Sequence, residues 1–255
     1  MQKETDRRMS NIWLLASLLP IAIAIVFVGY FFISTIDLFS SIDISTPYYN
    51  YNEFNLGDRT VCIIIGFMGL INFGVSIGFI CMLINRRHSH FKRQKVFAKD
   101  TVATITTIAK IKDVKMEAGF ASIERAAREK IEENEKNAIF WAILSSLIPF
   151  IVIYVYYFLM SDFYKHERRE NIFWENVSEA LNELDIKFST PQRTKAIPKR
   201  SFVLYLVLLI ITSGLFVTYW TYILLKDPNE HFKYHIKVEK QLISAIDNSN
   251  ITESE

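Results

Sequence analysis

Four long apolar runs, each free of Asp, Glu, Lys, Arg and His, constrain the fold of this 255-residue chain more than any other feature. A helix needs about 20 apolar residues to cross a hydrocarbon core about 30 Å thick. Backbone polar groups in lipid must bond within their own segment, so each run is expected to be helical. We therefore predict an all-α, polytopic membrane protein with four transmembrane helices, at residues 12–36, 61–84, 138–160 and 201–225.

The distribution of Lys and Arg predicts the orientation of these spans. The N-terminal tail has three such residues, the first loop (37–60) has only Arg59, and the second loop (85–137) has thirteen. This pattern predicts a multi-pass cell-membrane protein with both termini and the second loop in the cytoplasm. Four spans place the third loop, 161–200, outside, although it carries eight Lys and Arg residues. The alternative is a third segment that enters the membrane and returns to the same side, which leaves this loop in the cytoplasm.

Three regions follow from this topology. Residues 1–85 form an N-terminal pair of spans with an external loop, and residues 86–137 form a cytoplasmic helical hairpin that turns at Gly119. The second helix of the hairpin is expected to continue without interruption into the third span. Residues 138–255 form a C-terminal pair of spans with loop 161–200 and an amphipathic C-terminal tail. After the second, third and fourth spans, apolar residues recur at helical spacing, which is typical of amphipathic helices at an interface.

A motif in the fourth span resembles a known family. Residues 212–220 read TSGLFVTYW, and residues 227–232 read DPNEHF. The pattern T-x-G-[IL]-[FY]-x-x-[YF]-W followed by D-x-N-x-H-F is similar to that of a family of uncharacterised prokaryotic, often archaeal, polytopic membrane proteins. The resemblance covers mainly residues 160–247 and implies a prokaryotic membrane protein. It carries over no functional residue.

Small residues in the second span predict a close helix contact. Gly74 and Gly78 form a G-x-x-x-G pair, Gly66 lies on the same helix, and Asn72 can form a hydrogen bond across an interface. Small residues at this spacing allow two helix backbones to approach closely in a membrane. The partner is either another span of the same chain or another subunit, as in a homo-oligomer or a complex with a different membrane protein.

Basic residues gather immediately after the second span. Such a cluster beside a membrane favours contact with anionic lipid headgroups. Binding of single-stranded nucleic acid requires aromatic side chains on which bases stack, and only Phe91 lies within this cluster, so we expect no nucleic-acid partner. The predicted membrane-surface cluster consists of Arg86, Arg87, Lys92, Arg93 and Lys95.

The five histidines all follow spans, and two of their spacings are compatible with metal binding. These are the His88/His90 pair and the i, i+4 pair His231/His235. The first pair points to different faces of a helix, no carboxylate cluster is evident, and an external third loop separates His166 from the rest. We therefore expect no metal and no other cofactor. Cys62 and Cys81 lie about 30 Å apart along one helix and cannot form a disulfide within the chain.

The functional hypothesis rests on spans without charge and on the absence of known catalytic motifs. The sequence has no phosphate-binding loop, nucleophile elbow or HExxH motif. We expect a non-catalytic membrane component, an accessory subunit or scaffold of a larger complex, surrounded by membrane lipids. A transporter or channel subunit is the alternative, although coupled transport usually needs ionisable groups at mid-depth. A further alternative is an insertase-like protein, because the order of spans and hairpin is similar to that superfamily.

Overall fold

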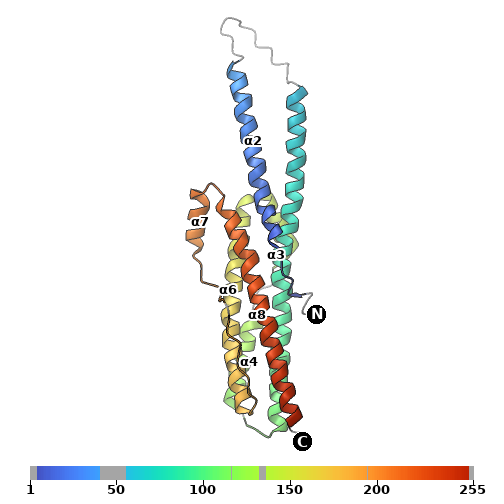
Figure 1. Ribbon diagram of the computed structural model, residues 1–255, viewed down its shortest axis with the longest axis vertical. Helices are drawn as coiled ribbons and strands as arrows, with labels where there is room; N and C mark the ends of the chain where they lie inside the picture. Colours follow the sequence, from blue (N-terminus) through green and yellow to red (C-terminus); the bar gives the residue numbers. More distant parts are fainter. Residues whose placement is uncertain (1–4, 41–55, 116, 132–135, 194, 253–255) are drawn as a thin grey trace.

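A computed structural model describes residues 5–40, 56–115, 117–131, 136–193 and 195–252, and these residues form helices without any strand (Figure 1). The all-α prediction is confirmed. Most of the predicted external loop lies outside the described residues. The elements are η1 (Asn11–Trp13), α2 (Leu14–Ser40), α3 (Leu56–Ile111), α4 (Glu117–Ile131), α5 (Ala138–Leu147), α6 (Pro149–Glu183), α7 (Phe202–Ile211) and α8 (Phe216–Thr252).

Two helices of the described chain are long and apolar enough to cross a membrane. One segment, Asn11–Ile36, coincides with the first predicted span, and the other, Arg59–Ile111, contains the second. At 1.5 Å per residue the 56 residues of α3 extend about 84 Å, so this helix continues far beyond any bilayer. The four-span prediction is therefore not confirmed, and the coarser statement, two helices of spanning length, holds.

The third predicted span is divided into two helices that pack against each other. Asn137 is the N-cap of helix α5, and its side chain accepts a hydrogen bond from the Phe140 backbone N–H at 3.0 Å. Ile148 is extended, with φ −122° and ψ 98°, and Pro149 starts α6. A proline has no N–H and disfavours a helical conformation in the residue before it, so the chain breaks here rather than only bending.

The fourth predicted span is divided in the same way. Helix α7 ends where Ser213 and Gly214 adopt left-handed backbone conformations, with φ 48° and 91°. The Thr212 hydroxyl then accepts a hydrogen bond from the Phe216 backbone N–H at 3.0 Å, which caps the start of α8. With ten residues each, α5 and α7 are about 15 Å long, half of a hydrocarbon core.

Helices α2 and α3 extend beyond the upper ends of α6, α7 and α8, whereas the lower part of α3 lies beside α4, α6 and α8 (Figure 1). The prediction that loop 161–200 lies across the membrane from the second loop is wrong. Arg87 of α3 pairs with Asp162 of α6 at 2.9 Å, and residues of both loops share one helical bundle. The alternative, in which the third segment returns to the side it left, agrees with this packing.

The hairpin at 86–137 is present, but its predicted turn and ending are wrong. The chain turns near Asp113, whose φ is 53°, and Gly119 lies inside α4. Helix α4 does not continue into the third predicted span, because Asn137 is the extended N-cap of a separate helix. Helix α4 packs on α6 as well as on α3, so the hairpin belongs to the bundle and does not project alone.

Three buried clusters are stacked along the molecule. The upper cluster includes Ile84, Leu159 and Trp220, and the lower one includes Ile105, Phe173 and Leu181. Between them lies a small hydrophobic cluster formed by Phe91, Phe163, Phe232 and Ile197. This middle layer surrounds the polar site described next.

Candidate metal centre

Four histidines and a glutamate converge between α3, α6 and α8. Helix α3 contributes His90, α6 contributes His166 and Glu170, and α8 contributes His231 and His235. On α6 and on α8 the two residues are separated by four positions in the sequence, so the two side chains project from the same face of their helix. All five side chains are buried, and their ligand atoms lie within 4.8 Å of one another.

The distances between these atoms fit coordination of one ion. Glu170 Oε1 lies 2.9 Å from His166 Nε2, and Glu170 Oε2 lies 2.6 Å from His235 Nε2 and 3.4 Å from His231 Nε2. The two Nε2 atoms of His231 and His235 are 3.1 Å apart. Ligands at about 2.1 Å from a metal and at right angles to each other are separated by about 3.0 Å. The spacing of the cluster is therefore that of neighbouring ligands around a transition metal.

Carboxylates bind the far sides of two imidazoles, and a third carboxylate lies beside another imidazole beyond hydrogen-bond distance. Asp6 Oδ1 lies 2.8 Å from His90 Nδ1, and Glu167 Oε2 lies 3.2 Å from His231 Nδ1. Glu239 Oε1 is 3.8 Å from His235 Nδ1. Histidines that bind metals usually donate their other N–H to a carboxylate or carbonyl, which fixes the ring and leaves Nε2 to the ion. Asp6 comes from the segment before α2, so the N-terminal tail takes part in the site.

One nitrogen that faces this cluster has no protein partner. His90 Nε2 is buried and makes no hydrogen bond within the part of the chain that the structure describes. The ring lies 5.3, 5.2 and 5.0 Å, centre to centre, from those of His166, His231 and His235. A buried polar atom without a partner costs about 1–3 kcal/mol. A ligated cation would satisfy it.

The charges around the cluster suit a divalent cation. Arg93 binds Asp6 at 2.6 Å and Glu239 at 2.8 Å. Arg193 lies 2.8 Å from Glu167 and 3.9 Å from Glu170. Arg86 also interacts electrostatically with Asp6. Four carboxylates thus lie near three guanidinium groups, which leaves an excess of one negative charge. Burying such an excess without compensation is costly.

Two of the histidines, His90 and His231, are held in the neutral form that can act as a ligand. Burial, and then the neighbouring histidines, lower the pKa of His90 well below its ordinary value. Burial lowers the pKa of His231 to about 3, despite the nearby Glu170. Metal binding requires deprotonated imidazole, so at neutral pH no proton has to be displaced from these rings.

Two of the three reasons given from the sequence against a metal centre are wrong. The first, that His88 and His90 lie on different faces of a helix, agrees with the structure. His166 joins His90, His231 and His235, and Glu170 supplies the carboxylate that the histidine spacings lacked. The half-buried His88 lies outside the cluster. The i, i+4 spacing of His166 and Glu170 matches that of His231 and His235, and this repeated spacing is the sequence signal that could have identified the site.

The predicted basic cluster does not form one surface. Arg86, Arg87 and Arg93 are buried, whereas Lys92 is exposed and Lys95 is half-buried. The Arg86 guanidinium donates to the Asn229 side chain and to the Leu225 carbonyl, and Arg87 and Arg93 form ion pairs. The prediction of a headgroup-binding cluster is therefore wrong for the three arginines, which stabilise the bundle instead.

The predicted glycine contact is not made within the described chain. A Cβ placed at Gly66, Gly74 or Gly78 would have no neighbouring atom within 4 Å, and Asn72 is half-buried. The alternative of a contact with another span of this chain is thus not found among the described residues. Contact with another subunit stays a prediction.

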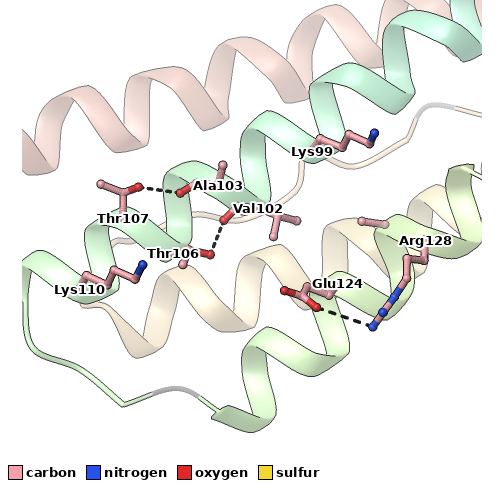
Figure 2. Close-up of a pocket in the computed structure, with 9 residues that line it drawn as sticks. Lys99, Val102, Ala103, Thr106, Thr107, Lys110, Glu124 and Arg128 are labelled. Atoms are coloured by element: carbon pink, nitrogen blue, oxygen red, sulfur yellow. Dashed lines mark hydrogen bonds and ion pairs between the residues drawn. The ribbon is translucent and has the colours of Figure 1, made fainter.

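A groove of about 500 Å³ between α3 and α4 does not have the features of a site (Figure 2). The hydroxyls of Thr106 and Thr107 donate to the backbone carbonyls of Val102 and Ala103 in their own helix. Glu124 and Arg128 form an exposed pair at 3.7 Å. Its polar groups are thus solvated or bonded locally, unlike those of the histidine cluster.

No family model matches the chain, and neither a curated protein nor a solved structure matches it.

Proposed function

We propose that this protein is a membrane-anchored metalloprotein that holds one divalent transition-metal ion between α3, α6 and α8. His90, His166, Glu170, His231 and His235 are its ligands. The convergence of five buried donor atoms within 4.8 Å carries this proposal. Structural zinc sites, by comparison, usually have four protein ligands, one fewer than the five proposed here.

The donor set favours iron, manganese or a similar six-coordinate metal. Imidazole suits iron, copper, nickel and zinc, whereas carboxylate suits harder ions such as manganese. Five protein ligands exceed the usual tetrahedral zinc set, and both oxygens of Glu170 lie within 3.4 Å of a ligand nitrogen. Cys62 is exposed and Cys81 only partly buried, and neither belongs to the cluster, so softer thiolate ligation plays no part.

A closed site of this kind supports a non-catalytic role. Catalytic metal sites keep a position open for water or substrate. Here five buried protein donors would occupy all but one position of a six-coordinate ion, and Glu170 would close the last position by binding with both of its oxygens. The ion would join three helices and, in the case of iron, could exchange an electron. This reading retains the hypothesis of an accessory or scaffold subunit of a larger membrane complex.

We also propose a topology with two complete spans and two hairpins that enter half of the bilayer. Helices α2 and α3 would cross, whereas α5 with the start of α6, and α7 with the start of α8, would each enter and return. The bundle then gathers the second loop with its thirteen Lys and Arg residues and the third with its eight on one side. The positive-inside tendency places that side, with both termini, in the cytoplasm.

The proposed membership of the prokaryotic membrane family agrees with this function. The segment of resemblance, 160–247, contains four of the five ligands, namely His166, Glu170, His231 and His235. If the other members of that family have the same ligands, they would bind a metal ion in the same way.

Elemental analysis tests the metal proposal. The protein is purified in mild detergent without chelators, and the metal content of each preparation is measured beside its helix content. We expect about one transition-metal ion per chain, lost in His166→Ala and His235→Ala and retained in His88→Ala. A metal-free protein, or equal loss in His88→Ala, would refute the proposed centre.

Labelling with a membrane-impermeant thiol reagent tests the topology. Single cysteines are placed at Ser45, Ser122 and Thr190 after both native cysteines are replaced by serine. We expect labelling of intact cells at Ser45 alone, and labelling of all three after the membrane is opened. Labelling at Thr190 in intact cells would contradict the cytoplasmic bundle.

A further inference from the structure

A second cavity lies where the two helix breaks meet α2. It has a volume of about 900 Å³, within the range of roughly 300–1,000 Å³ typical of small-molecule sites. One wall is α2, with Pro20, Ala24 and Gly29, and another is the start of α6, from Pro149 to Tyr156. The turn between α7 and α8 and Trp220 complete it.

The cavity is almost wholly apolar. Apart from backbone groups, its lining offers the hydroxyls of Ser213 and Tyr156 and the indole N–H of Trp220. The Tyr156 hydroxyl is already bonded to Thr221 at 2.9 Å. No ion or sugar could be bound by such walls, because a buried charge or a set of hydroxyls would lack partners.

The indole N–H of Trp220 distinguishes this cavity from a plain lipid-facing surface. Trp220 is only 1% exposed, and its Nε1 has no hydrogen-bond acceptor in the described part of the chain. The N–H of a buried tryptophan usually finds an acceptor. The ligand is therefore expected to carry one.

We infer that this cavity binds one hydrocarbon chain of a membrane lipid whose ester or ether oxygen accepts a hydrogen bond from Trp220. This inference rests on the proposed crossing of the bilayer by α2, since residues 20–29 then lie at mid-depth, but it does not depend on the metal centre. At that depth lipid chains are the abundant solvent. A lipid whose chain fills the cavity also separates the tips of the two hairpins from water.

Two substitutions fill the cavity without disturbing the fold. A Cβ at Gly29 has no atom within 4 Å, so Gly29→Leu occupies empty space. Ala24→Leu enlarges another side chain of the same helix that lines the cavity. Gly66→Leu is the matched control, because Gly66 also has open space but does not line the cavity. Trp220→Phe keeps a ring while removing the donor.

Native mass spectrometry of the protein released from detergent micelles, with quantification of extracted lipid, measures occupancy. We expect one tightly held lipid per chain in the wild type and in Gly66→Leu, at least a tenfold loss in Gly29→Leu and Ala24→Leu, and a smaller loss in Trp220→Phe. Equal lipid content in all variants would show a nonspecific lipid shell and overturn the inference, as would a lipid-free wild type.

A second measurement guards against misfolded variants and separates the two proposals. Wild-type protein is reconstituted in phosphatidylglycerol vesicles that contain a phospholipid with a photoreactive chain. Crosslinks in peptides of α2, α6 and α8 around the cavity support the inference, and crosslinks confined to the exposed face of α3 overturn it. Metal content is measured on the same samples, and we expect it to stay unchanged in the cavity variants.

Discussion

Apolar side chains are exposed in the upper half of α3 and buried in its lower half. In the upper half Ile63 and Leu70 are 72% and 71% exposed, whereas in the lower half Ile105 and Ala98 are fully buried. Residues 59–78 of α3 are mostly exposed, although this helix also packs on α2 and α5, whereas the lower half lies in a bundle with α4, α6 and α8 (Figure 1). One continuous helix thus meets two surroundings. In the bundle, side chains of the protein exclude water, whereas in the proposed topology lipid would do so around the upper half.

A pair of matched phenylalanine substitutions tests this contrast most strongly. Phe173 is fully buried in the bundle, whereas Phe67 on α3 is 64% exposed. We expect Phe173→Ala to lower the free energy of unfolding by about 3–5 kcal/mol, because it leaves a cavity. Phe67→Ala should change it by less than about 0.5 kcal/mol. Unfolding in micelles by denaturant measures both, and similar losses would show that the upper half is also packed against protein.

Ion pairs inside and outside the bundle provide a second contrast. Arg93 is buried between Asp6 and Glu239, whereas Arg125 forms an exposed pair with Glu129. Arg93→Met leaves two buried carboxylates without their cation and should cost about 3–5 kcal/mol. Arg125→Met should have little measurable effect, since exposed pairs contribute little. A mild effect of Arg93→Met in thermal unfolding would mean that water reaches this part of the bundle.

Removal of the metal should loosen the bundle without affecting the upper helices. A metal present at 100 times its dissociation constant stabilises the folded state by about 2.7 kcal/mol. Dialysis against a chelator should therefore speed amide hydrogen exchange around His90, His166 and His235, while the segment near Phe67 exchanges as before. A uniform change along α3 would contradict a local role for the ion.

Asp6 is expected to position His90 for the metal. Asp6→Asn keeps the shape of the side chain but weakens its bond to His90 Nδ1, and such changes typically cost 10–100-fold in metal affinity. Asp100→Asn, at an exposed position of α3, is the control. Competition with a chelating dye measures the affinity, and the absorption spectrum of the cobalt-loaded protein reports the ligand geometry. An unchanged spectrum and affinity would remove Asp6 from the site.

The smallest effect is expected at the glycine face. Gly74 has open space around it, so Gly74→Leu should alter the stability of a single chain by less than about 0.5 kcal/mol. If this face contacts another subunit, the substitution should instead change the oligomeric state measured by light scattering. Loss of chain stability would show that a close crossing exists within the chain after all.

The sequence predicts the helices better than their breaks. Apolar runs identify α2 and the first half of α3, because composition and length suffice for them. The runs at 138–160 and 201–225 are equally apolar, and the division at Pro149 and at Ser213–Gly214 depends on local backbone geometry. Hydropathy does not distinguish a helix that crosses from two half-length helices that fold back.

The site was missed for a related reason. An incorrect side of the membrane for 161–200 separated His166 and Glu170 from the other ligands, although all five lie in regions correctly predicted to be helical. Spacing along one helix shows which residues share a face. It does not show which three faces meet, and that depends on the direction in which each helix runs.

The N-terminal tail contacts a helix near the other end of the chain, and this determines when the contact can form during synthesis. Asn229 of α8 forms hydrogen bonds to both the backbone N–H and the carbonyl of Met9, across a separation of 220 residues. At a ribosomal rate of about 5–20 residues per second, the tail waits roughly 10–45 s before this partner has been made. During that time Asp6 and His90 lack the α8 side of the site. The proposed metal centre could therefore be completed only after nearly the whole chain has been made, so a truncated product would lack it.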